Sequence, residues 1–237
     1  MIVAHRGLHH GAPENSLAAF RAAWDVGIGW CECDVQRTAC FTPVVLHDDS
    51  LDRTTTAAGV LAGRRWHELA GVQLKNANDS LSDETIPCLH DVLREMRQYN
   101  QTEYLKHLLI EIKSPCDDSL TTAVASSADH RACAIQSFDM RVLLAAHRQN
   151  HRAPTYFLTE CTADVDRHLT APWTGINIRH DLISAAIVER VHLARKRVGV
   201  WTPNKEHELR RVINLGVDWV ITDEPLLAMK LVKGRSG

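Results

Sequence analysis

Short apolar segments alternate with amphipathic helical patterns along most of this chain, and no other feature constrains its fold as strongly. Parallel strands need a long connection between them, usually a helix, so the alternation predicts a parallel sheet. Many short strands within 237 residues favour an α/β fold whose sheet closes into a (β/α)8 TIM barrel over an open sheet. We expect strands near residues 2–5, 28–35, 43–47, 107–112, 133–137, 154–158, 175–178, 198–202 and 218–222.

Helix-capping residues precede three of the helical patterns. Serine and asparagine side chains accept hydrogen bonds from the free N–H groups of a first helical turn, and glycine commonly follows the last turn. We therefore expect helices over 17–26 after Asn15-Ser16, over 185–197 after Ser184, and over 205–215 after Asn204.

The connection between the second and third strand candidates is too short for a helix. Only about eight residues separate Asp34 from Pro43, whereas a parallel crossover needs a dozen or more. Strand 43–47 therefore either forms an antiparallel hairpin with strand 28–35 or lies outside the regular barrel. Nine strand candidates for eight barrel positions agree with either arrangement.

Residues 48–88 also break the alternation. This stretch contains three glycines and a long polar run, and it shows no sustained periodicity. Active sites of (β/α)8 barrels lie at the carboxyl ends of the strands, and an insertion directly after strand 43–47 would lie there. We predict a single domain over residues 1–237, with an insertion at about 48–88 that forms a small cap near the active site.

Composition excludes several functional classes. Apolar residues make up 45% of the chain and charged residues 24%, which is typical of a globular protein. The 27 basic and 29 acidic residues give a formal net charge of −2. This balance argues against a nucleic-acid partner and against a stable membrane anchor. No apolar run approaches the roughly 18 residues that a membrane span needs.

The location of the protein is predicted from its first residues and its cysteines. The first strand candidate begins almost at Met1, so we expect no signal peptide and a cytoplasmic protein. Seven cysteines are an odd number without the spacing of a zinc site, and we interpret them as reduced structural thiols. The sequence indicates no interface for an oligomer, so the oligomeric state stays open.

Three carboxylates fall at positions where strands would bring them together. Alternate side chains of a strand share a face, so Glu32 and Asp34 point the same way. Glu111 and Lys113 likewise share a face of the strand near 107–112. Buried like charges are unfavourable unless a cation or hydrogen-bond donors offset them.

Two interpretations of these acids stay open at this point. Oxygen ligands alone suit Mg²⁺, Ca²⁺ or Mn²⁺ better than zinc, so the three carboxylates are a candidate site for one divalent cation. The alternative is that they form buried ion pairs with Arg6, Arg37 or Lys113.

Two histidines lie at the ends of strand candidates near the acids. His5 follows the first strand and His47 follows the third. Imidazole titrates near neutral pH, so the pair suits proton transfer, with one histidine as base and the other as acid. Arg6 and Lys113 add positive charge that a phosphate would neutralise. A cation together with two basic side chains fits a small anionic phosphodiester better than a neutral substrate.

Short motifs occur in a fixed order along the chain, and together they resemble the glycerophosphodiester phosphodiesterases, in particular the short cytosolic bacterial type. The resemblance extends from about residue 2 to residue 228. Any single motif is weak, whereas the ordered set is specific. The motifs are His5-Arg6-Gly7, Pro13-Glu14-Asn15-Ser16, Glu32-x-Asp34, His47-Asp48, Asp52-Arg53-Thr54-Thr55, Glu111-x-Lys113, Gln136-Ser137-Phe138, Trp201-Thr202-Pro203-Asn204 and Thr222-Asp223-Glu224-Pro225.

This resemblance implies metal-dependent hydrolysis of glycerophosphodiesters to sn-glycerol 3-phosphate and an alcohol on a phosphodiesterase-type TIM barrel. The glycerol 2-hydroxyl of the substrate would attack phosphorus, and water would then open the resulting cyclic phosphate. A nucleophile held within the substrate has a proximity advantage. The family's residues map onto Glu32, Asp34 and Glu111 as ligands of one Mg²⁺ or Ca²⁺ (Mn²⁺ as a further choice), His5 and His47 as catalytic base and acid, Arg6 and Lys113 as phosphate-binding cations, and Trp201 against the glycerol or leaving group.

Other residues in the motifs receive weaker assignments. Gln136 is a candidate to line the site. Glu14 either orients a group near the metal or stabilises the start of a helix, where an acid is favoured. Asn15 is interpreted as structural, and His9 and His10 are expected to be exposed.

Rival activities share parts of this pattern. A sphingomyelinase D-like phosphodiesterase would share the barrel, the histidines and the first two acids, but such proteins are secreted and usually carry aspartate at the position of Glu111. A lysophospholipase D-type activity would depend on the lipid reach of the cap. A catalytically silent module that binds phosphodiesters is the alternative from another class. The leaving alcohol and the choice between Mg²⁺ and Ca²⁺ are not fixed by the sequence.

Overall fold

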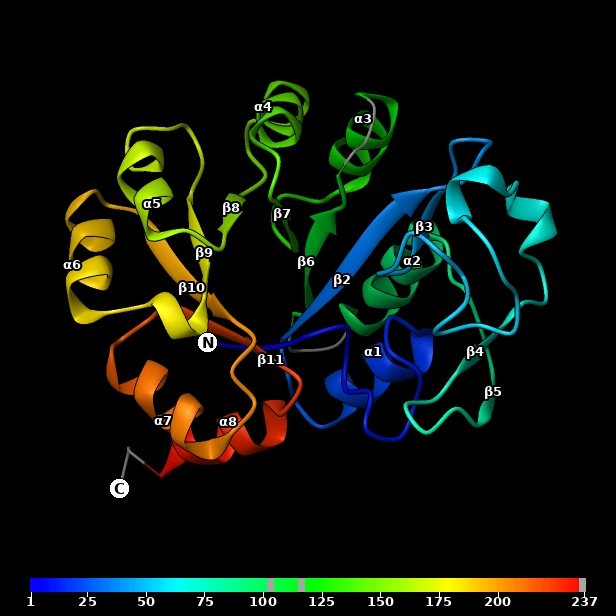
Figure 1. Ribbon diagram of the computed structural model, residues 1–237, viewed down its shortest axis with the longest axis horizontal. Coiled ribbons are helices and arrows are strands. Elements are labelled where there is room, and N and C mark those ends of the chain that lie inside the picture. The colour runs from blue at the N-terminus through cyan, green and yellow to red at the C-terminus, as the bar shows by residue number, and fades with distance from the viewer. Residues whose placement is uncertain (102–104, 115–117, 235–237) are drawn as a thin grey trace.

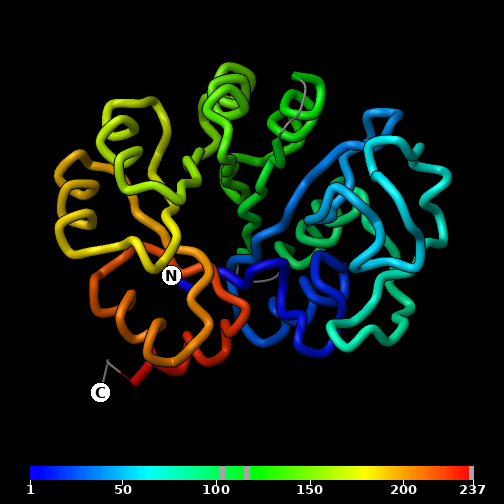
Figure 2. Tube along the Cα trace, viewed as in Figure 1, coloured from blue at the N-terminus to red at the C-terminus, as the bar shows by residue number. Residues whose placement is uncertain are grey.

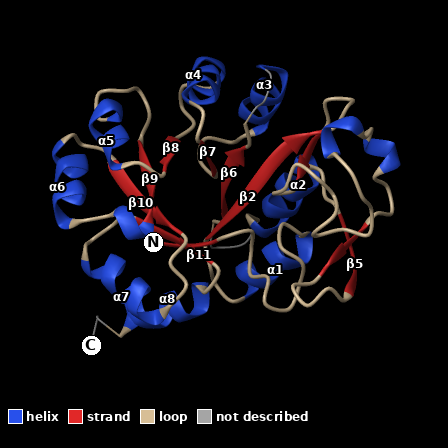
Figure 3. Ribbon diagram, viewed as in Figure 1, coloured by secondary structure: helices blue, strands red, loops and turns tan. Residues whose placement is uncertain are grey.

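The structure is a computed structural model that describes residues 1–101, 105–114 and 118–234. Eight parallel strands form a closed barrel, and a ring of helices surrounds them (Figures 1 and 3). The barrel strands are β1 (Ile2–Ala4), β2 (Trp30–Arg37), β6 (His107–Ile112), β7 (Cys133–Ser137), β8 (Thr155–Thr159), β9 (Gly175–Arg179), β10 (Arg197–Trp201) and β11 (Trp219–Thr222). Neighbouring strands follow chain order, and β1 closes the barrel by pairing with both β2 and β11.

Eight α-helices in the described residues cover the outside of the barrel, as the TIM-barrel prediction requires. Figure 2 shows the N-terminal segment in the middle of this ring, where it forms β1. The helices are α1 (Leu17–Asp25), α2 (Leu89–Tyr99), α3 (Asp118–Ser127), α4 (Met140–Gln149), α5 (Thr162–His168), α6 (Ala185–Leu193), α7 (Glu206–Asn214) and α8 (Pro225–Lys233).

The short third strand resolves the first break in the alternation. Strand β3 (Pro43–Val45) pairs antiparallel with the end of β2, with Val35 opposite Val45 and Arg37 opposite Pro43. Both alternatives hold, because β3 forms an antiparallel hairpin with β2 and lies outside the closed ring of eight parallel strands. This hairpin brings the chain back to the barrel mouth, where His47 follows.

The insertion after β3 has more regular structure than its lack of periodicity suggested. It contains two short 3-10 helices, η1 (Leu61–Gly63) and η2 (Trp66–Glu68), and a hairpin of β4 (Gln73–Lys75) and β5 (Leu81–Thr85). Its own apolar cluster includes Leu51, Leu61 and Leu74. In Figure 1 the insertion lies on one flank of the ring, beside α1 and α2. That it acts as a cap, and that residues 1–237 form one domain, stay predictions.

Two of the three predicted helix caps are confirmed. The side chains of Ser16 and Ser184 accept hydrogen bonds from N–H groups in the first turns of α1 and α6. The prediction for Asn204 is wrong, because Lys205 is the N-cap of α7. The Asn204 side chain instead bonds to Asp223, just beyond the neighbouring strand β11. The side chain of Asn204 therefore contacts Asp223 and does not cap the first turn of α7.

Three elements have boundaries that differ from the prediction by two residues or more. Strand β3 ends at Val45 instead of at residue 47. Strand β2 runs from residue 30 to residue 37, later than the predicted 28–35, because pairing with β3 prolongs it. Helix α6 ends at Leu193 instead of continuing to residue 197. Arg195 has a left-handed φ of 57°, which a right-handed helix cannot contain, and the next barrel strand already begins at Arg197.

A chain of buried polar groups rises through the barrel interior toward the site. Trp219 Nε1 donates to Asn177 Oδ1 at 2.7 Å, and Asn177 Nδ2 donates to Gln136 Oε1 at 2.8 Å. Gln136 Nε2 in turn donates to Glu32 Oε1 at 3.3 Å. Gly199 makes room for this chain, because a Cβ there would lie 1.7 Å from the Trp219 indole nitrogen. The packed barrel floor thus fixes the orientation of Glu32.

The structure describes six of the seven cysteines and the helices that were searched for a membrane span. The six described cysteines are free thiols, with Cys31, Cys33 and Cys133 buried, while Cys116 lies outside the described residues. Within the described ranges, no helix is both long enough and apolar enough to cross a bilayer.

Candidate active site

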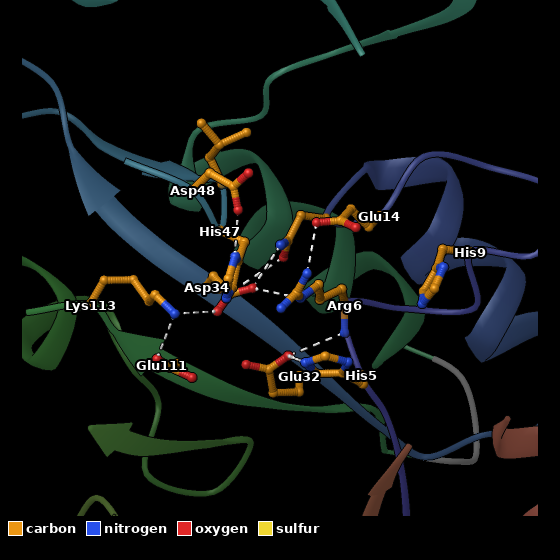
Figure 4. A network of polar contacts seen from close by, with 12 residues as sticks. His5, Arg6, His9, Glu14, Glu32, Asp34, His47, Asp48, Glu111 and Lys113 are labelled. Atoms are coloured by element: carbon orange, nitrogen blue, oxygen red, sulfur yellow. Dashed lines mark hydrogen bonds and ion pairs between the residues drawn. The ribbon is translucent and has the colours of Figure 1, made fainter. Parts of the chain in front are cut away.

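The residues selected from the sequence gather at the carboxyl end of the barrel, and Figure 4 shows all of them except Trp201. His5 and Lys113 directly follow β1 and β6, and Trp201 is the last residue of β10. The cavity at this end is lined by the predicted residues His5, Arg6, Glu32, His47, Glu111, Lys113 and Trp201, together with Gln136 and Phe138.

Three buried carboxylates meet at this end of the barrel, and two of them, Glu32 and Glu111, line the cavity. Glu32 and Asp34 extend from the same face of β2, as their spacing predicts, and Glu111 lies beside Asp34 on the paired strand β6. One oxygen atom of each acid lies within 4.8 Å of the other two. Glu32 and Asp34 are each 1% exposed and Glu111 is 8% exposed. All three offer only oxygen ligands, so the set is a possible site for a hard divalent cation.

The three acids differ in the direction in which their pKa values are shifted. Burial, followed by the charges of Asp34 and Glu111, raises the pKa of Glu32 well above its usual value. Burial and the charge of Asp34 raise the pKa of Glu111 to about 7. Burial would also raise the pKa of Asp34, but Arg6 and Lys113 outweigh it and lower this pKa to about 2. A bound cation would favour the ionised form of all three acids.

The alternative of buried ion pairs is realised in part. Lys113 Nζ lies 2.9 Å from Glu111 Oε1 and 3.4 Å from Asp34 Oδ1. Arg6 Nε lies 3.2 Å from Asp34 Oδ2. Glu32, by contrast, accepts hydrogen bonds from the backbone N–H of Arg6 and from the Gln136 amide. The ion pairs therefore neutralise two of the acids more than the third, and they remain compatible with a bound cation.

Arg6 is held between two carboxylates. Its Nη1 donates to Glu14 Oε1 at 2.8 Å, while its Nε faces Asp34 (Figure 4). Arg53 of the insertion donates to both oxygens of Glu14, at 2.8 and 3.0 Å. Glu14 therefore links the insertion to Arg6, in agreement with the orienting role considered for it.

Asn15 does more than hold the turn before α1. Its Nδ2 donates to Asp34 Oδ2 at 2.9 Å, and its Oδ1 accepts from the Asp34 backbone N–H at 3.2 Å. Both contacts are buried, and Asn15 adopts a left-handed φ of 58° that aims its side chain inward. Asn15, interpreted from the sequence as structural, therefore also fixes the carboxylate of Asp34.

His5 follows β1 in a tight turn and contacts an aspartate through one ring nitrogen. Its Nδ1 lies 2.7 Å from Asp223 Oδ1, and its Nε2 lies 4.0 Å from Glu32 Oε2. The turn depends on Gly7, whose φ is 84° and whose Cβ, if present, would lie 2.7 Å from the backbone carbon of Ala19. The ring thus spans the distance between Asp223 and the acidic cluster.

The prediction that His9 and His10 are exposed is wrong for His9. His9 is partly buried, and its Nε2 lies 3.1 Å from the Asp223 oxygen that also contacts His5. His10 is exposed, as predicted, and its Nε2 lies 3.0 Å from the Asp223 carbonyl oxygen. Sequence reasoning missed these contacts because they join residues more than 200 positions apart.

His47 has a similar partner on the opposite side of the acids. Its Nδ1 lies 2.7 Å from Asp48 Oδ1. Arg53 donates to both oxygens of Asp48, at 2.6 and 2.9 Å. Gln36 of β2 donates to the backbone carbonyls of His47 and Asp48 and holds the loop in place. Burial lowers the pKa of His47, and the hydrogen bonds from Arg53 lower the pKa of Asp48.

Two aromatic side chains flank the cavity. Phe138 and Trp201 meet edge to face with their ring centroids 5.5 Å apart. Trp201 Nε1 donates to the Asn177 carbonyl oxygen at 3.2 Å, which fixes the indole. Arg37, considered above as a partner of the acids, lies over the ring of Phe41. Trp201 lines the cavity, and its contact with the glycerol or the leaving group stays a prediction.

The fold and the site agree with one family. A sequence model of the glycerophosphoryl diester phosphodiesterase family matches residues 5–227. The chain belongs to this family and is a phosphoric diester hydrolase. The resemblance found in the motifs and the expected enzyme class are confirmed. The roles of individual site residues stay predictions.

Individual relatives match along nearly their whole length. The glycerophosphodiester phosphodiesterase of Caldanaerobacter subterraneus subsp. tengcongensis is 27% identical over 246 residues, which cover 98% of each chain. A solved Oleispira antarctica phosphodiesterase, in complex with the product sn-glycerol-3-phosphate, has a TM-score of 0.86 at 25% identity and covers 98% of this chain and 96% of its own. A glycerophosphodiester phosphodiesterase from Parabacteroides distasonis has a TM-score of 0.83 at 21% identity, covering 100% and 98%.

Proposed function

We propose that this protein hydrolyses glycerophosphodiesters to sn-glycerol 3-phosphate and an alcohol at the cavity described above, with the help of one divalent cation. The observation that carries the proposal is the meeting of three buried carboxylates, two basic side chains and two aspartate-bound histidines at one barrel mouth. The Oleispira antarctica phosphodiesterase, solved with sn-glycerol-3-phosphate, supports the substrate class.

Glu32, Asp34 and Glu111 would hold the cation. The all-oxygen donor set fits Mg²⁺, Ca²⁺ or Mn²⁺. The raised pKa values of Glu32 and Glu111 support the fit, because both acids would ionise more readily beside a positive charge. When bound, the cation would stabilise charge that develops on the phosphoryl oxygens.

Arg6 and Lys113 would bind the phosphate. Arg6 lines the cavity, and a phosphate oxygen could accept from its guanidinium while Nε faces Asp34. Lys113 lines the same cavity. Trp201 and Phe138 form an apolar wall on which the glycerol or the leaving alcohol would pack.

The two histidines would move the protons. In the first step His5 takes the proton of the glycerol 2-hydroxyl through Nε2, the oxygen–phosphorus bond forms, and the bond to the leaving alcohol breaks as His47 protonates that oxygen. In the second step the roles exchange, and water opens the cyclic phosphate to glycerol 3-phosphate. An intramolecular nucleophile needs little more from the protein than orientation and proton transfer.

The proposal is tested by measuring release of glycerol 3-phosphate from glycerophosphocholine and glycerophosphoethanolamine. We expect release with Mg²⁺, Ca²⁺ or Mn²⁺ and none in EDTA. His5→Ala and His47→Ala should each lower kcat at least about a hundredfold, which is the usual scale of general acid–base catalysis. His151→Ala is the matched control, because His151 is exposed in the loop before β8, at the opposite end of the barrel.

Two outcomes would count against the proposal. A folded, metal-loaded protein that releases no glycerol 3-phosphate from any diester would reject the reaction. Full activity of both histidine variants would reject the site. A lysophospholipid arm of the same assay separates lysophospholipase D-type activity from hydrolysis of the water-soluble diesters.

A further inference from the structure

Asp223 is the meeting point of side chains that come from distant parts of the chain. Its Oδ1 lies 2.7 Å from His5 Nδ1 and 3.1 Å from His9 Nε2. Its Oδ2 accepts from Asn204 Nδ2 at 2.6 Å. None of the proton-transfer steps proposed for the two histidines uses this carboxylate, although it touches the proposed base directly.

The position of Asp223 is fixed by the closure of the barrel. The backbone N–H of Asp223 donates to Asn204 Oδ1 at 3.0 Å, so one asparagine side chain contacts both its backbone and its carboxylate. Thr222 Oγ1 donates to the Pro203 carbonyl at 2.7 Å, and the His5 backbone N–H donates to the Thr222 carbonyl at 3.1 Å. These bonds join β1, β10 and β11 and leave the Asp223 side chain little freedom.

Asp223 is ionised, so it can only accept hydrogen bonds. Burial would raise its pKa, but the hydrogen bonds from His5 and His9 outweigh burial and hold the pKa well below the usual range. A carboxylate acceptor at Nδ1 requires the proton of a neutral imidazole to be on Nδ1. The other nitrogen, Nε2, then has a free lone pair, and it is this nitrogen that points toward Glu32 and the cavity.

We propose that Asp223 is a positioning residue for His5, which holds the ring in the Nδ1–H tautomer with Nε2 directed at the reacting hydroxyl, and that Asn204 and His9 hold Asp223 in place. This inference rests on the proposed function, in which His5 acts as the base. The same logic operates in other enzymes whose catalytic histidine bonds an aspartate through Nδ1.

A metal site and a purely structural ion pair both fit the cluster less well. A metal is not indicated, because within the described residues His5, His9 and Asp223 do not form a group with metal-ligand spacing. A purely structural ion pair would not need to orient a ring that also lines the cavity. Such a pair does exist at the other end of the barrel, where Asp218 Oδ2 lies 3.0 Å from His192 Nε2 just before β11.

The first test reads the tautomer directly. We would record nitrogen chemical shifts of ¹⁵N-histidine-labelled, metal-loaded protein at a pH where His5 is neutral, with His5→Gln identifying the resonances. The proposal predicts a protonated Nδ1 and an unprotonated Nε2. The opposite tautomer, or rapid exchange between the two, would overturn it. This readout needs no activity, so it remains decisive even if the proposed function fails in the glycerol 3-phosphate assay.

The second test measures catalysis in Asp223→Asn. The amide would donate to Nδ1 and force the wrong tautomer, a change that lowers turnover about ten-thousandfold in the serine proteases. We expect kcat to fall at least about a hundredfold with KM changed less than about threefold, and we expect Asn204→Ala to lie between this variant and the wild type.

Asp218→Asn is the matched control, because it removes an aspartate–histidine contact five positions earlier without touching the cavity. We expect it to retain wild-type kcat and the wild-type His5 tautomer. A folded Asp223→Asn protein with wild-type kcat would overturn the proposal. If Asp223→Asn does not fold, the proposal is tested by the tautomer of His5 in the wild-type protein and by the kcat of Asn204→Ala.

Discussion

The two sides of the site orient their histidines with different means. On the His5 side, Asp223 receives hydrogen bonds from a neutral amide and a second histidine, at the closed seam of the barrel. On the His47 side, Asp48 is bound through both oxygens by an arginine that belongs to the insertion. The His5 ring is 18% exposed and the His47 ring 34%. We call these groups the His5 side (His5, His9, Asn204, Asp223) and the His47 side (His47, Asp48, Arg53, Glu14).

This difference has a consequence for proton transfer. A carboxylate that is already paired with arginine stabilises a neighbouring imidazolium less than an unpaired one does. Asp48 is paired in this way, and burial lowers the pKa of His47. A histidine that loses its proton readily suits the acid of the first step. The unequal partners thus support His5 as base and His47 as acid.

The largest effect that we expect on a property other than catalytic turnover concerns the stability of the protein, and it comes from the buried acid Glu111. In metal-free protein, burial and Asp34 hold the pKa of Glu111 at about 7, above its unfolded value near 4.5. The native state therefore binds more protons than the unfolded state between these values, and stability falls as pH rises from about 4.5 to about 7. We expect a loss on the order of 3 kcal/mol, which saturating metal should remove.

This loss is measured by urea unfolding in EDTA across the pH range. The lowered pKa of His47 acts in the opposite direction below about pH 6.5. The difference between wild type and Glu111→Gln cancels the His47 contribution, and it reports Glu111 together with the rise that its charge causes in the pKa of Glu32. A difference curve that stays flat from pH 4.5 to pH 7 would contradict the prediction. It would mean that Lys113 alone neutralises Glu111.

The sequence predicts the barrel and the arrangement of the acids better than it predicts the contacts of the two histidines. The barrel follows from the alternation of strands and helices, and the shared face of Glu32 and Asp34 follows from the two-residue period of a strand. The hairpin of β3 follows from a connection too short for a crossover. Each of these predictions depends on residues that are close in the chain or on a repeated strand–helix unit, so it can be made from the sequence alone.

The contacts of the two histidines cannot be predicted from the alternation of elements or from the period of a strand. His5 and Asp223 are 218 positions apart and meet only because β1 closes the barrel against β11. Asn204 looks like a helix cap because asparagine favours that position, yet its amide is used by Asp223 instead. Arg53 lies in a stretch without periodicity, so no pattern places it beside Asp48. The motifs contain these residues, but their contacts require the three-dimensional fold.

Removing Arg53 should disturb the His47 side more than the His5 side. Arg53→Ala leaves Asp48 and Glu14 without their shared cation. We expect kcat/KM to fall about tenfold, and the limb of the pH–rate profile that reports His47 should move to higher pH, because an unpaired Asp48 stabilises the imidazolium. Arg53→Lys should rescue little, because lysine cannot form the paired hydrogen bonds of a guanidinium.

The control for Arg53 is Arg210→Ala, which removes an exposed arginine paired with Glu206 on α7. It should leave both the rate and the pH profile unchanged. The tautomer and kinetic effects of Asp223→Asn should be similar in the presence and absence of Arg53, because residues without shared partners act additively. Strong non-additivity would show that the two sides are one network.

The smallest expected effect is a response to salt. Arg53 is 49% exposed, so its ion pairs with Glu14 and Asp48 are open to screening, whereas the His5 side relies on an amide and a closed strand pair. We expect kcat at saturating substrate to fall about twofold between about 0.1 and 1 M NaCl. Saturation separates this change from weaker binding of the anionic substrate. The Arg53→Ala variant should lose the salt dependence and Asn204→Ala should keep it, and equal dependence in all three proteins would place the effect outside the His47 side.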